Sequence, residues 1–208
     1  MRILIVLGAE SPPTFVRNQV NGLVRSPGFE VGVLAKAGIQ KYTPDVKVLV
    51  SEFRRWSAVR MIGCLLLAML KDRRTLFKAA QLTNPEVQRK VWLKRLYRTY
   101  LVVRFNPTVI HFQWAAHTLD YSKLILSKEY KCLVSLRGTQ VNGEPLLDVV
   151  LAEHYRRIFP NVYLHAVSEA MKQKALSWGG NELMTKVIYS PVPQFFFEAF
   201  QLGGWSPS

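Results

Sequence analysis

The chain has 208 residues and a formal net charge of +14; 49% of its residues are hydrophobic and 20% are charged. This length suits one domain with a full core better than two, and the composition excludes a disordered or low-complexity chain. The longest purely apolar run, Met61 to Leu70, is shorter than the roughly 20 residues that span a bilayer, which excludes a transmembrane helix.

The first predicted element is a buried strand. Residues Ile3 to Leu7 form an unbroken apolar run, which a strand carries only when both of its faces are covered, as in the middle of a parallel sheet. Gly8 permits a tight exit, and Thr14 is placed to cap a helix that carries Phe15 on its apolar face. Ligands of open α/β sheets bind beyond the carboxyl ends of the strands, so Gly8 to Thr14 should line a crevice. The alternative is an ordinary connecting loop.

Two further strands and two helices are predicted next. Strands at residues 30–35 and 46–50 follow from their apolar residues and the Pro-Gly break before the first. Helices are expected at 54–71 and 85–104. The second helix is predicted to be amphipathic, with an apolar side and a basic side. The basic residues are Lys90, Lys94, Arg95 and Arg98.

Positive charge is concentrated between Arg54 and Arg104, which carry a net +11 of the chain's +14. A solvated basic surface is one interpretation. Attraction to an acidic membrane, worth about 1 kcal/mol per basic residue near the surface, is another. Nucleic acid would be attracted equally, but the sequence has no helix-turn-helix, zinc-finger or RNP-like pattern, so no nucleic-acid partner is expected.

Beyond Pro107 strands and helices alternate. The predicted elements are strands at 108–113, 131–136, 161–167 and 186–189, and helices at 116–130, 145–158 and 169–178, the last of them capped by Ser168. This alternation predicts an α/β fold: a doubly wound, Rossmann-like parallel sheet with helices on both faces. The domain should cover residues 1–194, with 195–208 as a linker or truncated tail.

Polar residues at the predicted strand ends are the candidate site residues, because the carboxyl ends of parallel strands lie on one rim. His111 and His117 are the candidate catalytic residues, since an ordinary histidine pKa near 6.5 suits a general base. Arg137 follows a strand directly, where a guanidinium can hold a phosphate or carboxylate. The candidate substrate-binding residues are Gly8, Thr14, Phe15, Gln113, Arg137, Gly138, Thr139, Gln140 and Ser168.

Plainer interpretations stay open for these residues. His111 lies between apolar neighbours, where backbone groups can satisfy its ring. Arg137 can form a surface salt bridge, and His165 lies in an apolar run that favours a core position. Cys64 and Cys132 also lie in apolar segments, as reduced core cysteines of a cytoplasmic protein do, and no metal-binding spacing is present. The amino terminus is a poor signal peptide because it lacks a small-residue cleavage site.

Common nucleotide-binding and hydrolase signatures are absent from the sequence: there is no Gly-x-Gly-x-x-Gly after the first strand, no phosphate-binding Gly-x-x-x-x-Gly-Lys loop and no Gly-x-Ser-x-Gly elbow. Five blocks in order instead resemble the amino-terminal half of family 4 GT-B glycosyltransferases. They are Thr14–Val20, Val109–Gln113, Leu136–Gln140, His165–Glu169 and Lys186–Pro193.

The resemblance implies an acceptor-binding domain without a cofactor of its own, for a sugar or lipid-linked acceptor. A separate carboxyl-terminal domain would bind the nucleotide sugar, so the isolated domain should have no turnover. The chain departs from the family where His-x-His becomes His111-Phe-Gln113 and where His-Gly-x-Asp becomes Arg137-Gly-Thr-Gln140. These losses favour the alternative, a non-catalytic ligand-binding or scaffolding domain. A position on the inner face of an acidic membrane is expected if the acceptor is lipid-linked.

Overall fold

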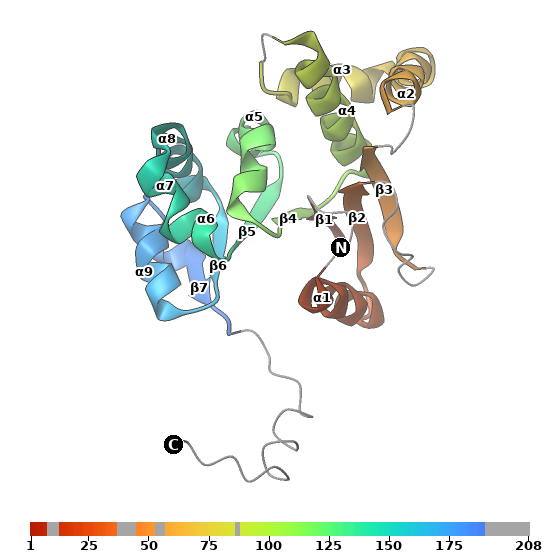
Figure 1. Cartoon of the computed structure of the whole chain (residues 1–208). Coiled ribbons are helices and arrows are strands. Elements are labelled where there is room, and N and C mark those ends of the chain that lie inside the picture. Colours follow the sequence, from red (N-terminus) through yellow and green to blue (C-terminus); the bar gives the residue numbers. More distant parts are fainter. Residues whose placement is uncertain (8–12, 37–44, 53–56, 86–87, 190–208) are drawn as a thin grey trace.

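A single parallel sheet organises the molecule (Figure 1). The computed structural model describes residues 1–7, 13–36, 45–52, 57–85 and 88–189. Within these ranges, seven strands pair in the order β3-β2-β1-β4-β5-β6-β7. They are β1 (Arg2–Val6), β2 (Glu30–Lys36), β3 (Lys47–Glu52), β4 (Val109–Phe112), β5 (Lys131–Leu136), β6 (Tyr163–Ala166) and β7 (Thr185–Val187). The predicted Rossmann-like sheet is confirmed, and β1 lies inside it between β2 and β4.

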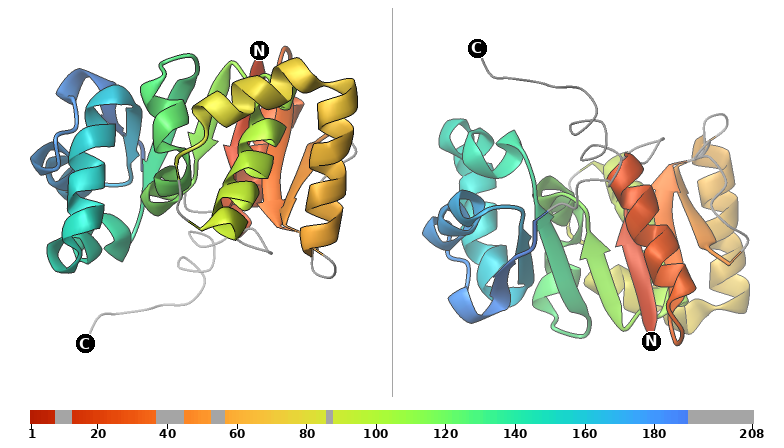
Figure 2. Two further views of the ribbon diagram at one scale, coloured as in Figure 1. Left: turned by 90° about the horizontal axis from the view of Figure 1, so that it is seen from above. Right: turned by 90° about the horizontal axis from the view of Figure 1, so that it is seen from below.

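Helices cover both faces of the sheet, as predicted. The α-helices are α1 (Thr14–Arg25), α2 (Ser57–Lys71), α3 (Arg73–Leu82), α4 (Arg89–Phe105), α5 (Ser122–Leu126), α6 (Thr139–Asn142), α7 (Glu144–Leu147), α8 (Val149–Ile158) and α9 (Glu169–Ser177). Short 3-10 helices are η1 (Ala115–Tyr121), η2 (Phe159–Asn161) and η3 (Glu182–Met184). Helix α1 lies on one face over β1 and β2, while α4 lies on the other (Figure 2).

Alternation along β1 divides the core into two clusters. Ile3 and Ile5 pack with Val16 and Val20 of α1. Leu4 of the same strand points to the opposite face, where α4, α5, α8 and α9 contribute the larger cluster. Since both faces of β1 are covered, its side chains are buried from Ile3 onward, which is what an unbroken apolar strand requires.

Close approach of α4 to β2 depends on a glycine. A Cβ atom on Gly32 would lie 2.7 Å from the ring of Phe105, so no larger residue fits without a shift. The helix then ends at Asn106, whose backbone is left-handed with φ of 51°. Asn106 N donates to the carbonyl oxygen of Val102 at 3.0 Å, the usual geometry of a helix end.

Several element boundaries differ from the prediction. The helix expected at 116–130 is the 3-10 helix η1 followed by α5, because the Thr118 hydroxyl donates to the carbonyl oxygen of Ala115 at 2.6 Å and competes with regular helix bonds. The helix expected at 145–158 is interrupted at Asp148, which caps α8 by accepting from Leu151 N at 3.1 Å. Helix α3 was not predicted. Only Ala79 and Leu82 of it are buried, so the apolar stripe that would mark this helix in the sequence is short.

The predicted capping role of Thr14 is wrong. Thr14 is the first helical residue, Pro13 occupies the cap position, and no side-chain bond caps the helix. Ser168 does cap α9, accepting from Met171 N at 3.2 Å. Gly8 and the tail at 195–208 lie outside the described residues. Among the described residues, no helix is long and apolar enough to cross a bilayer, and no cluster of His, Cys, Asp or Glu could hold a metal ion.

Candidate substrate-binding site

Polar side chains of three neighbouring strands share the sheet face that α1 covers only in part. The right view of Figure 2 shows α1 across β1 and β2, with β4 and β5 beside it. Because Ile110 and Phe112 point into the larger cluster, His111 points the other way. Register pairs Ser135 of β5 with His165 of β6. The pleat therefore places three polar residues side by side on a mostly apolar sheet.

Hydrogen bonds fix the protons along this row. Nε2 of His165 lies 2.9 Å from the carbonyl oxygen of Ile188, which can only accept, so this nitrogen carries a proton. In the neutral ring Nδ1 then accepts from the Ser135 hydroxyl at 3.0 Å. Ser135 Oγ in turn accepts from Nε2 of His111 at 2.8 Å. One backbone carbonyl thus sets the tautomers of both histidines.

The other ring nitrogen of His111, Nδ1, is an acceptor and faces two side-chain amides. Its Nδ1 lies 3.3 Å from the side-chain nitrogen of Gln19 on α1 and 3.3 Å from that of Gln113. The two glutamines also bond each other, with Gln113 Nε2 donating to Gln19 Oε1 at 2.9 Å. Gln113 Oε1 is buried, and no group of the described residues forms a hydrogen bond with it. His111 therefore holds a pair of amides beneath the rim, with one acceptor left over.

Burial keeps His111 neutral. The side chain is 3% exposed, and the pKa of His111 is lowered to about 3, first by this burial and then by the nearby charges of His165 and Arg137. The pKa of His165 is also lowered, mainly by burial. A buried ring with both nitrogens bonded is poorly suited to take a proton from an attacking hydroxyl. The geometry favours a positioning role for His111.

Arg137 lies at the end of this row, just past β5. Its guanidinium carbon stacks 4.1 Å from the centre of the Phe15 ring. Among the described residues it has no acidic partner, and its Nε is buried without a hydrogen bond. Burial lowers the pKa of Arg137, although a guanidinium stays charged at neutral pH. The salt bridge considered for Arg137 is absent from the described residues.

Aromatic rings continue the rim away from Arg137. Phe15 lies edge-on to Trp114 with ring centres 6.4 Å apart, and Trp114 lies 5.3 Å from the ring of His117. Helix α6 contacts the same region through Gln140, whose Oε1 accepts from Ala116 N at 3.4 Å. The structure thus brings Phe15, His117, Gln140 and Arg137 to neighbouring positions.

The other predicted site residues lie near the strand ends with plainer surroundings. Thr14 is exposed at the first turn of α1, and Gly138, also exposed, has a φ of 64° that favours glycine. Thr139 begins α6. Ser168 follows β6 but uses its hydroxyl as a cap. Their substrate-binding roles stay predictions.

Sequence reasoning missed part of the row. Gln19 follows Phe15 by one helical turn, so both lie on the same side of α1. Ser135 is a polar residue between buried Val134 and Leu136 in a strand, a signal that a buried hydroxyl is being used. His165 was expected in the core; it is half-buried and bonded at both nitrogens.

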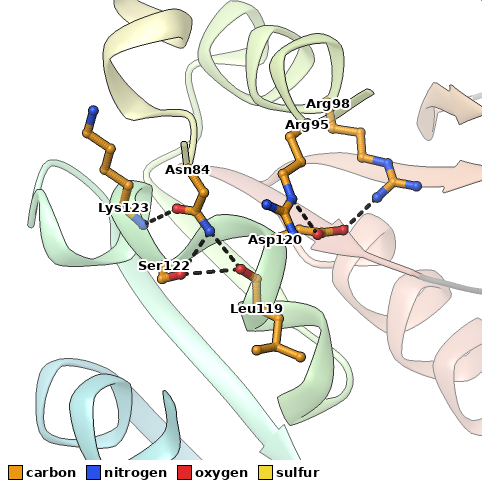
Figure 3. Close-up of polar contacts among 7 residues, drawn as sticks. All are labelled: Asn84, Arg95, Arg98, Leu119, Asp120, Ser122 and Lys123. Carbon is orange, nitrogen blue, oxygen red and sulfur yellow. Dashed lines mark hydrogen bonds and ion pairs between the residues drawn. The ribbon is translucent and has the colours of Figure 1, made fainter. Parts of the chain in front are cut away.

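A second polar cluster corrects the interpretation of the basic helix (Figure 3). Asp120 of η1 accepts from Arg95 Nε at 3.1 Å and from Arg98 Nη1 at 2.6 Å. Both arginines are about one-fifth exposed. Helix α4 is also buried on several sides and not along a single stripe. Arg95 and Arg98 therefore hold α4 against η1 and are not part of a solvated basic face.

Beside this ion pair, one amide joins the segment after α3 to η1 and α5 (Figure 3). Asn84 Nδ2 donates to the carbonyl oxygen of Leu119 at 2.7 Å and to Ser122 Oγ at 2.9 Å. Its Oδ1 accepts from Lys123 N at 2.7 Å. The segment after α3 is thereby fastened to the start of α5.

No family model and no curated protein matches the sequence. Among solved structures, the chain resembles the lipopolysaccharide outer core galactosyltransferase WaaB in its apo form, with a TM-score of 0.51 and 14% identity over 92% of this chain and 46% of that one. The chain shares its Rossmann-like α/β fold with part of that structure. It also resembles HepE of Anabaena in complex with UDP-glucose, with a TM-score of 0.48 and 12% identity over 98% of this chain and 50% of that one. The chain spans about half the length of each.

Proposed function

We propose that this chain is the acceptor-binding half of a family 4 GT-B glycosyltransferase. In this proposal the rim around Arg137 holds an anionic group of a glycan or lipid-linked acceptor. A separate donor-binding domain supplies the sugar from a nucleotide sugar, so the 208 residues alone have no turnover. The fold of the chain and its match to about half of the galactosyltransferase WaaB structure support this assignment.

The observation that carries the proposal is that Arg137 has no carboxylate partner among the described residues. Arg137 is held against Phe15 and has lost part of its hydration, and a phosphate or carboxylate would replace that hydration with charge-assisted bonds. Gln113 lies buried beneath the rim, where it bonds to Gln19 and His111. Its unpaired Oε1 would be satisfied by a sugar hydroxyl. A cation at the rim with an amide oxygen beneath it fits a phosphorylated or acidic sugar.

Within this assignment, the two candidate catalytic histidines differ. His111 is buried and committed to Ser135 and the glutamines, so it positions the amides. His117 lies beside Trp114 at the rim, and it is the residue we assign to proton transfer when a donor domain closes the site.

Calorimetric titration with inorganic phosphate and with hexose phosphates tests the anion site. Arg137→Ala should weaken binding by about 1.5–3 kcal/mol, the value of a hydrogen bond to a charged group. Arg156→Ala is the matched control, because Arg156 also stacks on an aromatic ring, that of Trp178 at 5.3 Å, at another place in the fold. Equal binding by all three proteins, or no binding by the unmodified chain, contradicts the site.

A transfer assay tests the half-enzyme assignment separately. The chain is incubated with common nucleotide sugars and phosphorylated acceptors, with and without an added donor-binding domain. Transfer should require the added domain. Robust transfer by the chain alone would contradict the assignment even if Arg137 binds phosphate.

A second candidate function is a non-catalytic ligand-binding or scaffolding domain derived from such a transferase. The burial and low pKa of His111 favour it, as do the glutamines at positions 113 and 140, which cannot act as acids or bases. If phosphate binding depends on Arg137 and no donor domain restores transfer, this second function is the correct one.

A further inference from the structure

Helix α2 is apolar on two opposite sides. Met61, Leu65 and Ala68 face the core and are buried. The other side is exposed to solvent, and its large apolar side chains are Val59, Ile62, Leu66, Leu67, Met69 and Leu70. Leu70 is 80% exposed, and Phe77 of α3 adds a ring that is 67% exposed. A helix that is apolar all round is normally buried. The exposed apolar side of α2 therefore indicates an interaction site.

The charges around this surface have one sign. Arg60, Lys71, Arg73 and Arg74 are all exposed on α2 and α3. The acidic residue in described residues 57–85 is Asp72, which is half-buried and accepts from the Tyr100 hydroxyl at 3.4 Å. Figure 2 (left) shows α2 at the outer edge of the molecule, beyond α4. An apolar strip with a basic border is therefore open to a large flat partner.

We propose that α2 and the start of α3 dock on an acidic lipid bilayer. The aliphatic side chains would enter the boundary between headgroups and acyl chains, where interfacial helices lie. The exposed arginines and lysines would remain among acidic headgroups, each adding attraction. A protein partner suits the surface less well, because its border carries charge of one sign, which the headgroups of an acidic bilayer match along its whole length.

Two other features are consistent with this choice. The exposed apolar side chains carry no hydrogen-bonding group, so a hydrocarbon boundary leaves nothing unsatisfied. Arg95 and Arg98 are committed to Asp120, so the basic surface available to lipids is that of α2 and α3 and not the middle of α4. Membrane docking is independent of the proposed sugar transfer, since it uses none of the residues at the Arg137 rim.

Co-sedimentation with vesicles tests the proposal. The full chain is mixed with vesicles of phosphatidylcholine alone or with one-third phosphatidylglycerol, at low salt and at about 0.5 M salt, where screening acts over a few ångströms. We expect strong binding to the acidic vesicles, weaker binding to neutral ones, and a partial loss in high salt. Equal binding to both vesicle types, or no binding to either, would overturn the proposal.

Two double variants locate the contact. Leu66→Ser with Leu70→Ser should weaken binding to both vesicle types by about tenfold or more, from the apolar area lost. Arg73→Gln with Arg74→Gln should weaken binding to acidic vesicles by about 30-fold and leave neutral vesicles unchanged. All substituted side chains are exposed, and circular dichroism confirms that each variant is folded.

The control, a third double variant, removes apolar surface elsewhere. Leu147 and Val150 are 92% and 72% exposed, but their neighbours Glu144 and Asp148 are acidic. Leu147→Ser with Val150→Ser should leave binding unchanged. If this control weakens binding as much as the α2 variant does, the chain adsorbs through any exposed apolar side chain and the assignment to α2 is wrong.

Discussion

The polar clusters on the α4 face and on the α1 face differ in the partners of their arginines. On the α4 face, Arg95 and Arg98 share the carboxylate of Asp120. On the α1 face, Arg137 is partly buried and stacks on the ring of Phe15, and it has no acidic partner among the described residues. A satisfied ion pair stabilises the fold and leaves little for a ligand to gain. A half-buried cation without an anion is the arrangement in which a ligand supplies the missing partner.

The largest effect should come from breaking the satisfied cluster. Asp120→Ala removes the carboxylate that two mostly buried guanidinium groups share, and we expect the free energy of unfolding to fall by about 3 kcal/mol. Urea denaturation measures it. Glu30→Ala is the control, because its pair with Arg2 is more exposed and should be worth less than about 1 kcal/mol. Similar losses in the two variants would remove the distinction between the clusters.

Acid should weaken the row beneath Arg137. The pKa of His111 is about 3 in the folded protein and about 6.5 when unfolded, so the unfolded chain binds the extra proton between these values. Stability is therefore full above about pH 6.5 and falls as the pH drops toward 3. Between pH 7 and pH 5 we expect a loss of about 2 kcal/mol from this histidine.

Urea denaturation of His111→Gln at both pH values checks this assignment. The variant should be less stable than the parent at pH 7 and should lose less stability on acidification. Other groups, including His154 with a lowered pKa of about 4, will contribute to both proteins alike. An identical pH dependence in parent and variant would show that His111 does not carry the effect.

The smallest effect on stability should come from Arg137 itself. Arg137→Met keeps an apolar stem against Phe15 and removes a charge that has no acidic partner among the described residues, so the free energy of unfolding should change by less than about 1 kcal/mol. Thermal and urea denaturation measure it. A loss as large as that of Asp120→Ala would mean that Arg137 serves the fold, and the contrast between the two clusters would be void.

The sequence by itself predicted the sheet and much of the rim. Apolar runs separated by helical segments favour parallel strands, and residues just past such strands must meet on one side. The sequence therefore predicts that His111, Gln113 and Arg137 lie toward one side of the sheet, since strand periodicity and strand polarity are local properties of the chain. The structure buries His111 and Gln113 beneath the rim that Arg137 occupies.

Partners across the chain were decided only by the tertiary structure. Gln19 reaches His111 across 92 residues of sequence and Asp120 reaches Arg95 across 25, and no local pattern encodes which carboxylate or amide arrives at a given cation. For this reason the sequence placed Arg95 and Arg98 on a basic helix face turned to solvent or to an acidic membrane, although packing of η1 against α4 brings them a shared partner. Helix α2 shows the same limit. Its apolar residues can be identified in the sequence, but the sequence does not show whether one side of the helix is buried or both. That depends on which other elements pack against the helix.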